Sequence, residues 1–279
     1  MSSLQKLALG TWLMGGTKDP DPNNDDEKDI ATIRLALDNG ITLIDTAQNY
    51  AGGKCEELVG EAVKDSPRDS YQILTKQAKN SLSYQGVIEG CKSSIKRLSV
   101  DYIDYFVCHA PNADFDMRDF FKASNQLYKD GLIRNIGVSN FGVKSLQIAL
   151  ETSDLPICLN QVSFSLSDGD ILRTSTYEFC VKNNIPIQAF RTLAKLEDDE
   201  EVIEALKTIA PKYNLTVHQV ALAYINSYKN MHFTVRASSQ EHWQQIKDAL
   251  KMKLQDDDLV TLKELHSNRI GVNGWFLEI

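Results

Sequence analysis

The sequence predicts an α/β fold, a parallel (β/α)8 barrel of eight strands with additional C-terminal helices, and three observations predict it. Short apolar runs alternate with amphipathic helical patterns from one end of the chain to the other. Eight of these runs have the length and composition of strands. The length of 279 residues fits one barrel, because such domains commonly reach about 200–250 residues or more. No flexible linker interrupts the pattern, so residues 1–279 are expected to form a single domain.

The expected strands are short apolar segments, each followed by a polar residue or a turn. The segment 103–107 is almost continuously apolar, as a strand covered on both faces should be. In chain order the expected strands are 7–12, 41–44, 71–74, 103–107, 133–138, 157–159, 185–189 and 233–235.

The expected helices carry apolar residues at three- and four-residue spacing. The first has an apolar stripe from Ile30 to Leu37. Asp25 or Asp26 is suited to cap its start, and Gly40 lies just past its end. The others are expected at 56–63, 87–98, 120–128, 143–150, 172–181, 201–209 and 217–228, and two further helices close the chain.

The balance of charges excludes one broad class of partner. Lys and Arg number 30 and Asp and Glu number 38, which gives a net charge of −8. Binding nucleic acid irrespective of its sequence requires a large excess of positive charge to displace counterions. No apolar run approaches the ~18 residues needed to cross a bilayer. We therefore expect no nucleic acid and no membrane as partners, and the sequence indicates no obligate protein partner.

Cysteine usage and the N-terminal segment both favour a cytoplasmic protein. The five cysteines are odd in number and contain no C-x-x-C pair, which is typical of free thiols in a reducing compartment and predicts no metal site. The segment Leu7–Gly16 resembles a short signal core. However, only Lys6 precedes it as a basic residue and no small-x-small cleavage site follows, so we interpret it as a buried strand and turn.

An open, doubly wound sheet is the alternative architecture. If it bound a dinucleotide, it would need a glycine-rich turn after its first strand. The motif G-x-G-x-x-G is absent, and the run 52–54 (GGK) lacks the spacer and the preceding glycine of a phosphate-binding loop.

In a parallel barrel the chemistry is expected at the C-terminal ends of the strands. There the sequence has Asp45 with Tyr50 just beyond it, then Lys76, then His109. A tyrosine with its ordinary pKa of ~10 is a poor acid at neutral pH unless a cation stabilises its phenolate. Lys76 would supply that cation, Asp45 would keep Lys76 charged, and His109 would donate to the same centre. The set suits protonation of a developing alkoxide.

Each of the four residues also has an ordinary structural interpretation. An aspartate after a strand often caps a helix, a lysine is usually solvated, a tyrosine packs at a rim, and a histidine is often a satisfied core residue. Their joint placement at one rim favours catalysis over these separate interpretations.

The residues lie in segments that resemble the aldo-keto reductase family of NADPH-dependent TIM-barrel oxidoreductases. The resemblance implies reduction of an aldehyde or ketone to the alcohol, with Tyr50 as proton donor, Lys76 and Asp45 as its tuning pair, and His109 orienting the carbonyl. The matching segments, in order, are LGTW (9–12), NGITLIDTAQNYAGGKCEELVGEAV (39–63), ILTK (73–76), SSIKRLSVDYIDYFVCHAP (93–111), LYKDGLIRNIGVSNF (127–141), NQVSFS (160–165) and VRASSQEH (235–242).

The resemblance also implies NADPH bound in an extended form across the mouth of the barrel. Ser139, Asn140 and Gln161 would hold the carboxamide of the nicotinamide, and Phe190 would stack on its ring. Arg236 falls where family members contact the 2′-phosphate, and a guanidinium suits such a contact, so NADPH is favoured over NADH. The implied cofactor-binding residues are Thr11, Trp12, Asp45, Ser139, Asn140, Gln161, Phe190, Arg191, Leu193, Arg236, Ser238, His242 and Gln245.

The sequence departs from the family pattern in several places. The stretch before Leu7 is short for the family's usual hairpin across the barrel floor. Segment 189–194 reads AFRTLA where Ala-Tyr-Ser-Pro-Leu is typical, which changes the pyrophosphate contacts and leaves Arg191 to compensate by charge. Ile246 stands where an adenine-contacting Asn is common, and Tyr224 where a Trp is common.

Two other functions remain open at this point. Part of the sequence resembles the potassium-channel β-subunits of the same family, which implies a cofactor-binding regulatory subunit with little turnover. A Schiff-base aldolase would also use a lysine at a strand end, here Lys76, but it does not account for Phe190 or Arg236.

The walls of a substrate pocket are expected from the loops 13–26, 110–118 and 164–171 and from the C-terminal end. The aromatic residues there are equally suited to line a pocket or to pack: Trp12, Phe115, Phe164 and Trp275.

Overall fold

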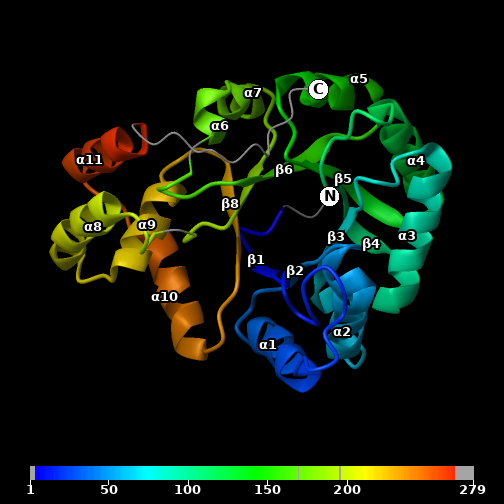
Figure 1. The fold of residues 1–279 in the computed structure, drawn as a ribbon, viewed down its shortest axis with the longest axis horizontal. Coiled ribbons are helices and arrows are strands. Elements are labelled where there is room, and N and C mark those ends of the chain that lie inside the picture. Colours follow the sequence, from blue (N-terminus) through cyan, green and yellow to red (C-terminus); the bar gives the residue numbers. More distant parts are fainter. Residues whose placement is uncertain (1–3, 169, 195, 268–279) are drawn as a thin grey trace.

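The computed structural model describes residues 4–168, 170–194 and 196–267. Eight parallel strands form a closed barrel in which each strand pairs with the next and β8 pairs with β1, as the sequence predicts (Figure 1). The strands are β1 (Leu7–Gly10), β2 (Leu43–Asp45), β3 (Gln72–Gln77), β4 (Ile103–Cys108), β5 (Ile133–Ser139), β6 (Ile157–Ser163), β7 (Ile187–Phe190) and β8 (Met231–Val235).

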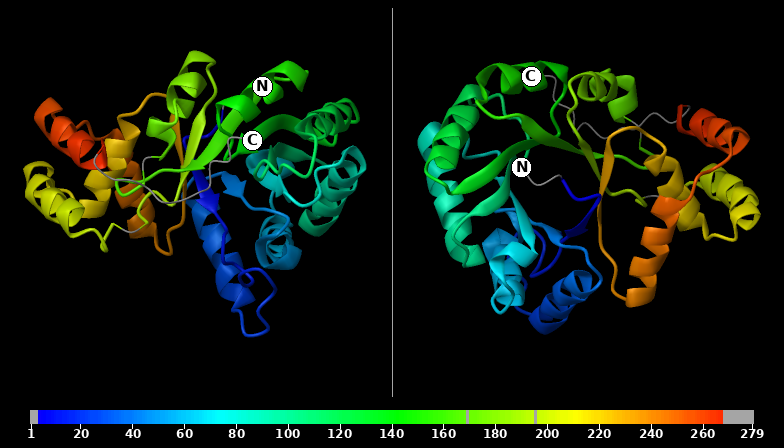
Figure 2. Two further views of the ribbon diagram at one scale, coloured as in Figure 1. Left: turned by 45° about the horizontal axis from the view of Figure 1, so that its top comes forward. Right: turned by 180° about the vertical axis from the view of Figure 1, so that it is seen from behind.

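Helices surround the barrel, and α8 packs beside α11 on one side of the molecule (Figures 1 and 2). Two 3-10 helices, η1 (Tyr50–Gly53) and η2 (Arg68–Ser70), precede α2 and β3. The α-helices are α1 (Asp26–Asp38), α2 (Lys54–Val63), α3 (Tyr84–Leu98), α4 (Met117–Lys129), α5 (Val143–Thr152), α6 (Asp170–Arg173), α7 (Thr176–Lys182), α8 (Glu200–Tyr213), α9 (Val217–Asn226), α10 (Gln240–Lys251) and α11 (Asp256–Ser267).

The single helix expected at 172–181 is wrong, because the chain breaks there into α6 and α7. Ser175 has φ = 56°, in the left-handed region that does not continue a helix. The Thr174 hydroxyl donates to Thr176 Oγ1 at 2.9 Å. Such local side-chain hydrogen bonds compete with the helical backbone pattern.

The alternation of side chains along the strands builds two layers inside the barrel. Leu43, Leu74 and Leu159 belong to an apolar inner cluster that fills the barrel with Ala8, Tyr105 and Val107. Two residues further along, on the same inner face, stand Asp45, Lys76 and Gln161. The residues between them, such as Ile44, point outward into the larger cluster beneath the helices. The strand period therefore places a polar layer directly above an apolar floor.

Among the described residues, none of the helices is both long and apolar enough to cross a membrane. All five cysteines are free thiols.

An arginine ties together the N-terminal ends of β3 and β4. Arg68 donates to the carbonyl oxygens of Tyr71 at 3.1 Å and Tyr102 at 2.9 Å, and to Asp104 Oδ2 at 2.6 Å. Asp104 Oδ2 also accepts from the Ile73 backbone at 2.8 Å. The guanidinium carbon of Arg68 lies 3.9 Å from the centroid of the Tyr102 ring. This cluster lies on the barrel face opposite the expected chemistry, so its role is stability.

Arg68→Met should therefore lower the free energy of unfolding by about 2–4 kcal/mol, because it leaves a largely buried carboxylate without its cation. Urea denaturation measures this. Arg118→Met is the matched control. The Arg118–Asp116 side chains are 50% and 55% exposed, against 21% and 13% for Arg68–Asp104. The control should change stability by no more than about 0.5 kcal/mol. Equal effects of the two substitutions would contradict a stabilising role of the Arg68 cluster.

Candidate active site

A cavity of about 590 Å³ opens at the C-terminal ends of the strands. It is the place where the sequence predicts the chemistry. Its wall combines apolar and aromatic side chains with a few polar and charged groups, which is typical of cofactor and substrate sites. The lining residues are Gly10, Thr11, Trp12, Leu13, Asp45, Asn49, Tyr50, His109, Ser139, Asn140, Gln161, Phe190, Arg191, Thr192, Leu193, Ala194, Leu222, Thr234, Val235, Arg236 and Ile246.

A buried ion pair lies at the base of this cavity. Lys76 Nζ bonds Asp45 Oδ1, and the two side chains are 0% and 3% exposed. The ammonium also donates to the carbonyl oxygen of Thr46 at 2.9 Å and to the Tyr50 hydroxyl oxygen at 3.2 Å. Burial acts to lower the pKa of Lys76, but the charge of Asp45 and the neighbouring phenol outweigh it, so the pKa is raised. Lys76 is therefore a charged group held against the Tyr50 phenol.

Tyr50 reaches the pair from η1, in which Ala51 and Gly52 have φ values of 47° and 60°. These left-handed conformations turn the chain sharply, so that the half-buried phenol points back toward Lys76. Burial raises the pKa of Tyr50, and the charge of Lys76 acts in the opposite direction. The predicted tuning by Lys76 is thus present, but burial has the larger effect on the pKa of this phenol.

His109 stands beside Tyr50, with their ring centroids 5.8 Å apart. Burial, together with the positive charges of Lys76 and Lys79, lowers the pKa of His109 to about 3. The imidazole is therefore neutral at physiological pH. Its Nδ1 is buried and has no hydrogen-bond partner among the described residues.

Ser139 and Asn140 line the cavity together, as the sequence predicts, and both are buried. Asn140, with φ = 61°, donates to the carbonyl oxygen of His109 and to Ser139 Oγ, each at 3.1 Å. The Oδ1 atom of Asn140 is buried and accepts no hydrogen bond from the described residues. An acceptor left open in a cavity wall fits a ligand that brings an N–H donor.

Gln161 is turned toward the ion pair. Its amide nitrogen donates to Asp45 Oδ2 at 2.7 Å and to Gln188 Oε1 at 2.9 Å. Only its oxygen remains to meet a ligand.

The expected aromatic ring and two arginines also line the cavity. Phe190 at the end of β7 and Arg191 and Leu193 just after it line the cavity, and Arg191 has φ = 58°. Arg236 follows β8 and donates to the carbonyl oxygen of Trp12 at 3.1 Å. Thr11 is buried, and its hydroxyl donates to the carbonyl oxygen of Asp45 at 2.9 Å.

Three predicted cofactor residues lie outside the lining of the cavity. Ser238 lies just before α10 and His242 in its first turn, and both are exposed. Gln245 donates to Glu241 Oε1 at 3.2 Å. Their neighbour Ile246 does line the cavity, so α10 reaches it at that point. A role for these three residues stays a prediction.

Of the aromatic residues expected near the substrate, Trp12 lines the cavity. Phe164 is fully buried against Tyr228, with ring centroids 5.3 Å apart, so it packs and does not line the pocket. Phe115 is half-buried outside the lining. Trp275 lies outside the described residues.

Sequence reasoning missed Thr234. Its hydroxyl donates to Asp45 Oδ2 at 2.9 Å from β8, so the second carboxylate oxygen of Asp45 accepts two hydrogen bonds. A signal existed, because Thr234 alternates with the outward-facing Phe233 and therefore belongs to the inner layer.

The sequence profile of the Aldo/keto reductase family matches residues 6–267. The chain belongs to the aldo/keto reductase family. This match confirms the resemblance that the motifs predict. At the level of the family, it also confirms the prediction of an NADP-dependent oxidoreductase that acts on carbonyl groups.

Three curated relatives support membership in this family. Methylglyoxal reductase YeaE of Escherichia coli is 28% identical over 95% of this chain and 92% of its own length. Glyoxal reductase of Bacillus subtilis is 31% identical over 87% and 85%. An NADH-specific methylglyoxal reductase of Escherichia coli is 26% identical over 94% and 95%.

Solved structures of aldo-keto reductases share the fold over most of both chains. A thermostable enzyme in complex with the inhibitor epalrestat has a TM-score of 0.88 and 32% identity, covering 94% of this chain and 95% of its own. An enzyme from Klebsiella pneumoniae in complex with NADP and acetate has a TM-score of 0.83 and 28% identity, covering 95% and 94%.

The neutral state of His109 predicts a pH dependence of stability in this aldo/keto reductase. In the unfolded chain the pKa of histidine is about 6.5, whereas in the folded state it is about 3. Between these values the unfolded state binds the additional proton, so stability is lost as the pH falls. Relative to His109→Asn, the wild-type protein should lose up to about 1.4 kcal/mol per pH unit below pH 6.5.

Urea denaturation of both proteins at several pH values measures the difference in their free energies of unfolding. The contributions of the carboxylates that both proteins contain cancel in this difference. The difference should be constant above about pH 7.5, where both states of His109 are neutral. A difference that is also constant between pH 4.5 and pH 6.5 would contradict a lowered pKa.

Proposed function

We propose that the chain reduces an aldehyde or ketone to the alcohol with NADPH, and that Tyr50 donates the proton. The observation that carries this proposal is the contact of 3.2 Å between Lys76 Nζ and the Tyr50 hydroxyl in the wall of the cavity. It pairs an acid with the charge that stabilises its conjugate base, which is what protonation of an alkoxide requires.

Tyr50, Lys76, Asp45 and His109 each have a separate role in this reaction. When bound, the reduced nicotinamide supplies the hydride to the carbonyl carbon. Tyr50 gives its proton to the carbonyl oxygen, and Lys76 stabilises the phenolate that remains. Asp45 keeps Lys76 charged and fixes its position. His109, neutral at physiological pH, donates an N–H to the carbonyl oxygen and orients it beside Tyr50.

The residues of the cavity fit the cofactor. The open acceptor Asn140 Oδ1 suits the N–H of a carboxamide, and the oxygen of Gln161 is also available to it. Phe190 offers a flat apolar surface for the ring. Arg191 and Arg236 supply positive charge for the phosphates. The Klebsiella pneumoniae structure with NADP supports the same cofactor here.

Small dicarbonyl compounds are the substrates that we propose to test first. The curated relatives include methylglyoxal and glyoxal reductases. The charge state of Lys76 disfavours the Schiff-base alternative, because an amine must lose its proton to attack a carbonyl.

Tyr50→Phe should lower kcat for methylglyoxal reduction by about 10²–10⁴-fold, because general acid catalysis contributes that much to the rate. The Kd for NADPH should change less than about twofold, since the phenylalanine ring keeps the wall intact. Absorbance at 340 nm measures turnover, and quenching of tryptophan fluorescence measures Kd. Turnover within about threefold of the wild type would exclude Tyr50 as the acid.

Arg236→Leu should raise the Kd for NADPH by about 10–100-fold through loss of a charge-assisted contact with the 2′-phosphate. The Kd for NADH, which lacks that phosphate, should stay within about twofold. Arg191→Leu is the matched comparison and should weaken both cofactors alike, because the pyrophosphate is common to them. An equal loss for both cofactors in Arg236→Leu would refute selection of NADPH by this residue.

A further inference from the structure

A buried carboxylate outside the cavity belongs to the helix that follows Tyr50. Glu56, in the first turn of α2, is 0% exposed. It does not line the cavity, and the proton transfer described above does not use it. A fully buried carboxylate is costly unless cations and hydrogen-bond donors surround it, so its partners show what it holds in place.

Glu56 joins α2 to β3. Thr75, which directly precedes Lys76 on β3, donates its hydroxyl to Glu56 Oε1 at 2.5 Å. Thr75 is itself fully buried and points outward from the strand, whereas Lys76 points inward. The carboxylate is therefore fixed to the residue beside the lysine that contacts Tyr50.

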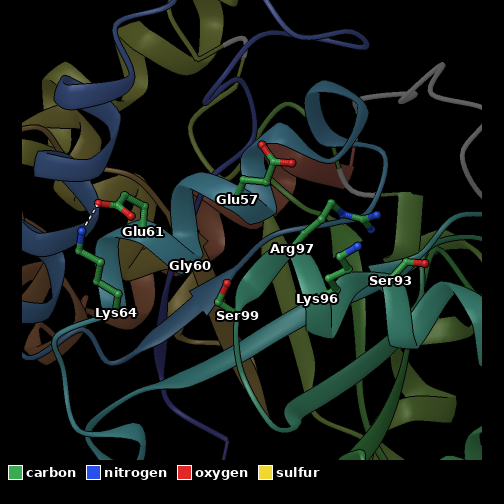
Figure 3. A pocket seen from close by; sticks show the side chains of 8 residues that line it. All are labelled: Glu57, Gly60, Glu61, Lys64, Ser93, Lys96, Arg97 and Ser99. Atoms are coloured by element: carbon green, nitrogen blue, oxygen red, sulfur yellow. Dashed lines mark hydrogen bonds and ion pairs between the residues drawn. The ribbon is translucent and has the colours of Figure 1, made fainter.

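Arg97 of α3 completes the arrangement. Its Nε and Nη2 atoms lie 2.7 Å and 2.6 Å from Glu56 Oε2. Arg97 also lines a hollow of about 720 Å³ on the outside of the barrel between α2 and α3 (Figure 3). Its side chain is 27% exposed, so water reaches one side of the guanidinium, which reduces the cost of burying the pair.

The same arginine packs against the segment that carries Tyr50. A Cβ atom on Gly53, the last residue of η1, would lie only 2.8 Å from Cδ and Nε of Arg97. Gly53 also has φ = 100°, which side chains rarely adopt. The Arg97 side chain thus passes directly over the backbone of η1 and then reaches Glu56.

We propose that Thr75, Glu56 and Arg97 form a clamp that positions Tyr50 against Lys76. One end holds α2 and the preceding η1, which carries Tyr50, and the other holds β3, which carries Lys76. The three are positioning residues and touch neither substrate nor cofactor. The inference rests on the proposed function for its catalytic consequence, but the geometry that it predicts is measurable without turnover.

The contact of 3.2 Å between the Tyr50 hydroxyl and Lys76 Nζ depends on how η1 is placed relative to β3. If the clamp loosens, Lys76 stabilises the phenolate less, and the pKa of Tyr50 rises. Misplacement by ~1 Å from a distant mutation is known to cost as much as ~10²-fold in rate. Loss of one clamp contact should therefore reduce kcat without removing a reacting group.

The test is Thr75→Val, which removes the hydroxyl but keeps the shape of the side chain. We expect a kcat lower by about tenfold and a Kd for NADPH within about twofold of the wild type. The alkaline limb of the plot of kcat against pH should move to higher pH, because a raised pKa keeps Tyr50 protonated up to a higher pH. Thr75→Ser restores the hydroxyl and should restore both properties. A merely structural role would lower stability without moving the pH profile.

Ser94→Ala is the matched control. Ser94 is also fully buried and accepts from Arg97 Nη2 at 3.4 Å, but it makes no contact with β3 among the described hydrogen bonds. Its removal should leave kcat and the pH profile unchanged. If Thr75→Val does not fold, Arg97→Lys replaces it, because lysine keeps the charge but lacks the Nε donor to Glu56.

An activity-independent measurement separates this inference from the proposed function. In protein labelled with ¹³Cζ-tyrosine, the Tyr50 signal is identified by its loss in Tyr50→Phe, and its titration gives the pKa directly. Thr75→Val should raise that pKa, and Ser94→Ala should not. An unchanged Tyr50 pKa in folded Thr75→Val protein would overturn the clamp. If the wild-type protein had no reductase activity, the proposed function would be overturned, but this titration would still test whether the clamp positions Tyr50.

Discussion

The ion pair between Lys76 and Asp45 is the interaction on which the site depends. Removing two charges from water is costly, and their mutual attraction offsets that cost only when the remaining hydrogen-bonding atoms are satisfied. The structure meets this requirement from three strands or their following loops. Thr46 offers its carbonyl oxygen to Lys76, while Gln161 and Thr234 donate to the second oxygen of Asp45. The pair therefore stays charged, and its charge reaches Tyr50.

The barrel makes this arrangement rigid. Leu43, Leu74 and Leu159 fill its interior, and the charged layer stands two residues further along the same strands. Because strands pair with their neighbours at fixed register, the inner side chains cannot slide past one another without exposing the apolar floor. Groups placed on such strands keep their geometry better than groups on loops.

Tyr50 is the exception, because it stands on η1 and not on a strand. Ala51, Gly52 and Gly53 all have positive φ, which makes the turn sharp but leaves the phenol without a strand to fix it. The neighbouring helix supplies the missing constraint from two consecutive residues. Cys55 donates to Thr11 Oγ1 at 3.0 Å, and Glu56 reaches Thr75 and Arg97. Through α2, the segment that carries Tyr50 is thus held from Thr11, just after β1, and from β3.

The sequence by itself determined the strand order, the apolar core and the strand-end positions of Asp45, Lys76 and His109, because alternation and strand ends are local properties of the chain. The tertiary structure decided what those residues touch. It turned the amide of Gln161 toward Asp45, added Thr234, left Ser238 and His242 outside the cavity lining, and broke the helix at Ser175. Alternation can place Thr234 on the inner face of its strand, but it does not show which residue Thr234 contacts, because its partner Asp45 lies 189 residues away in sequence. They meet only when the barrel closes.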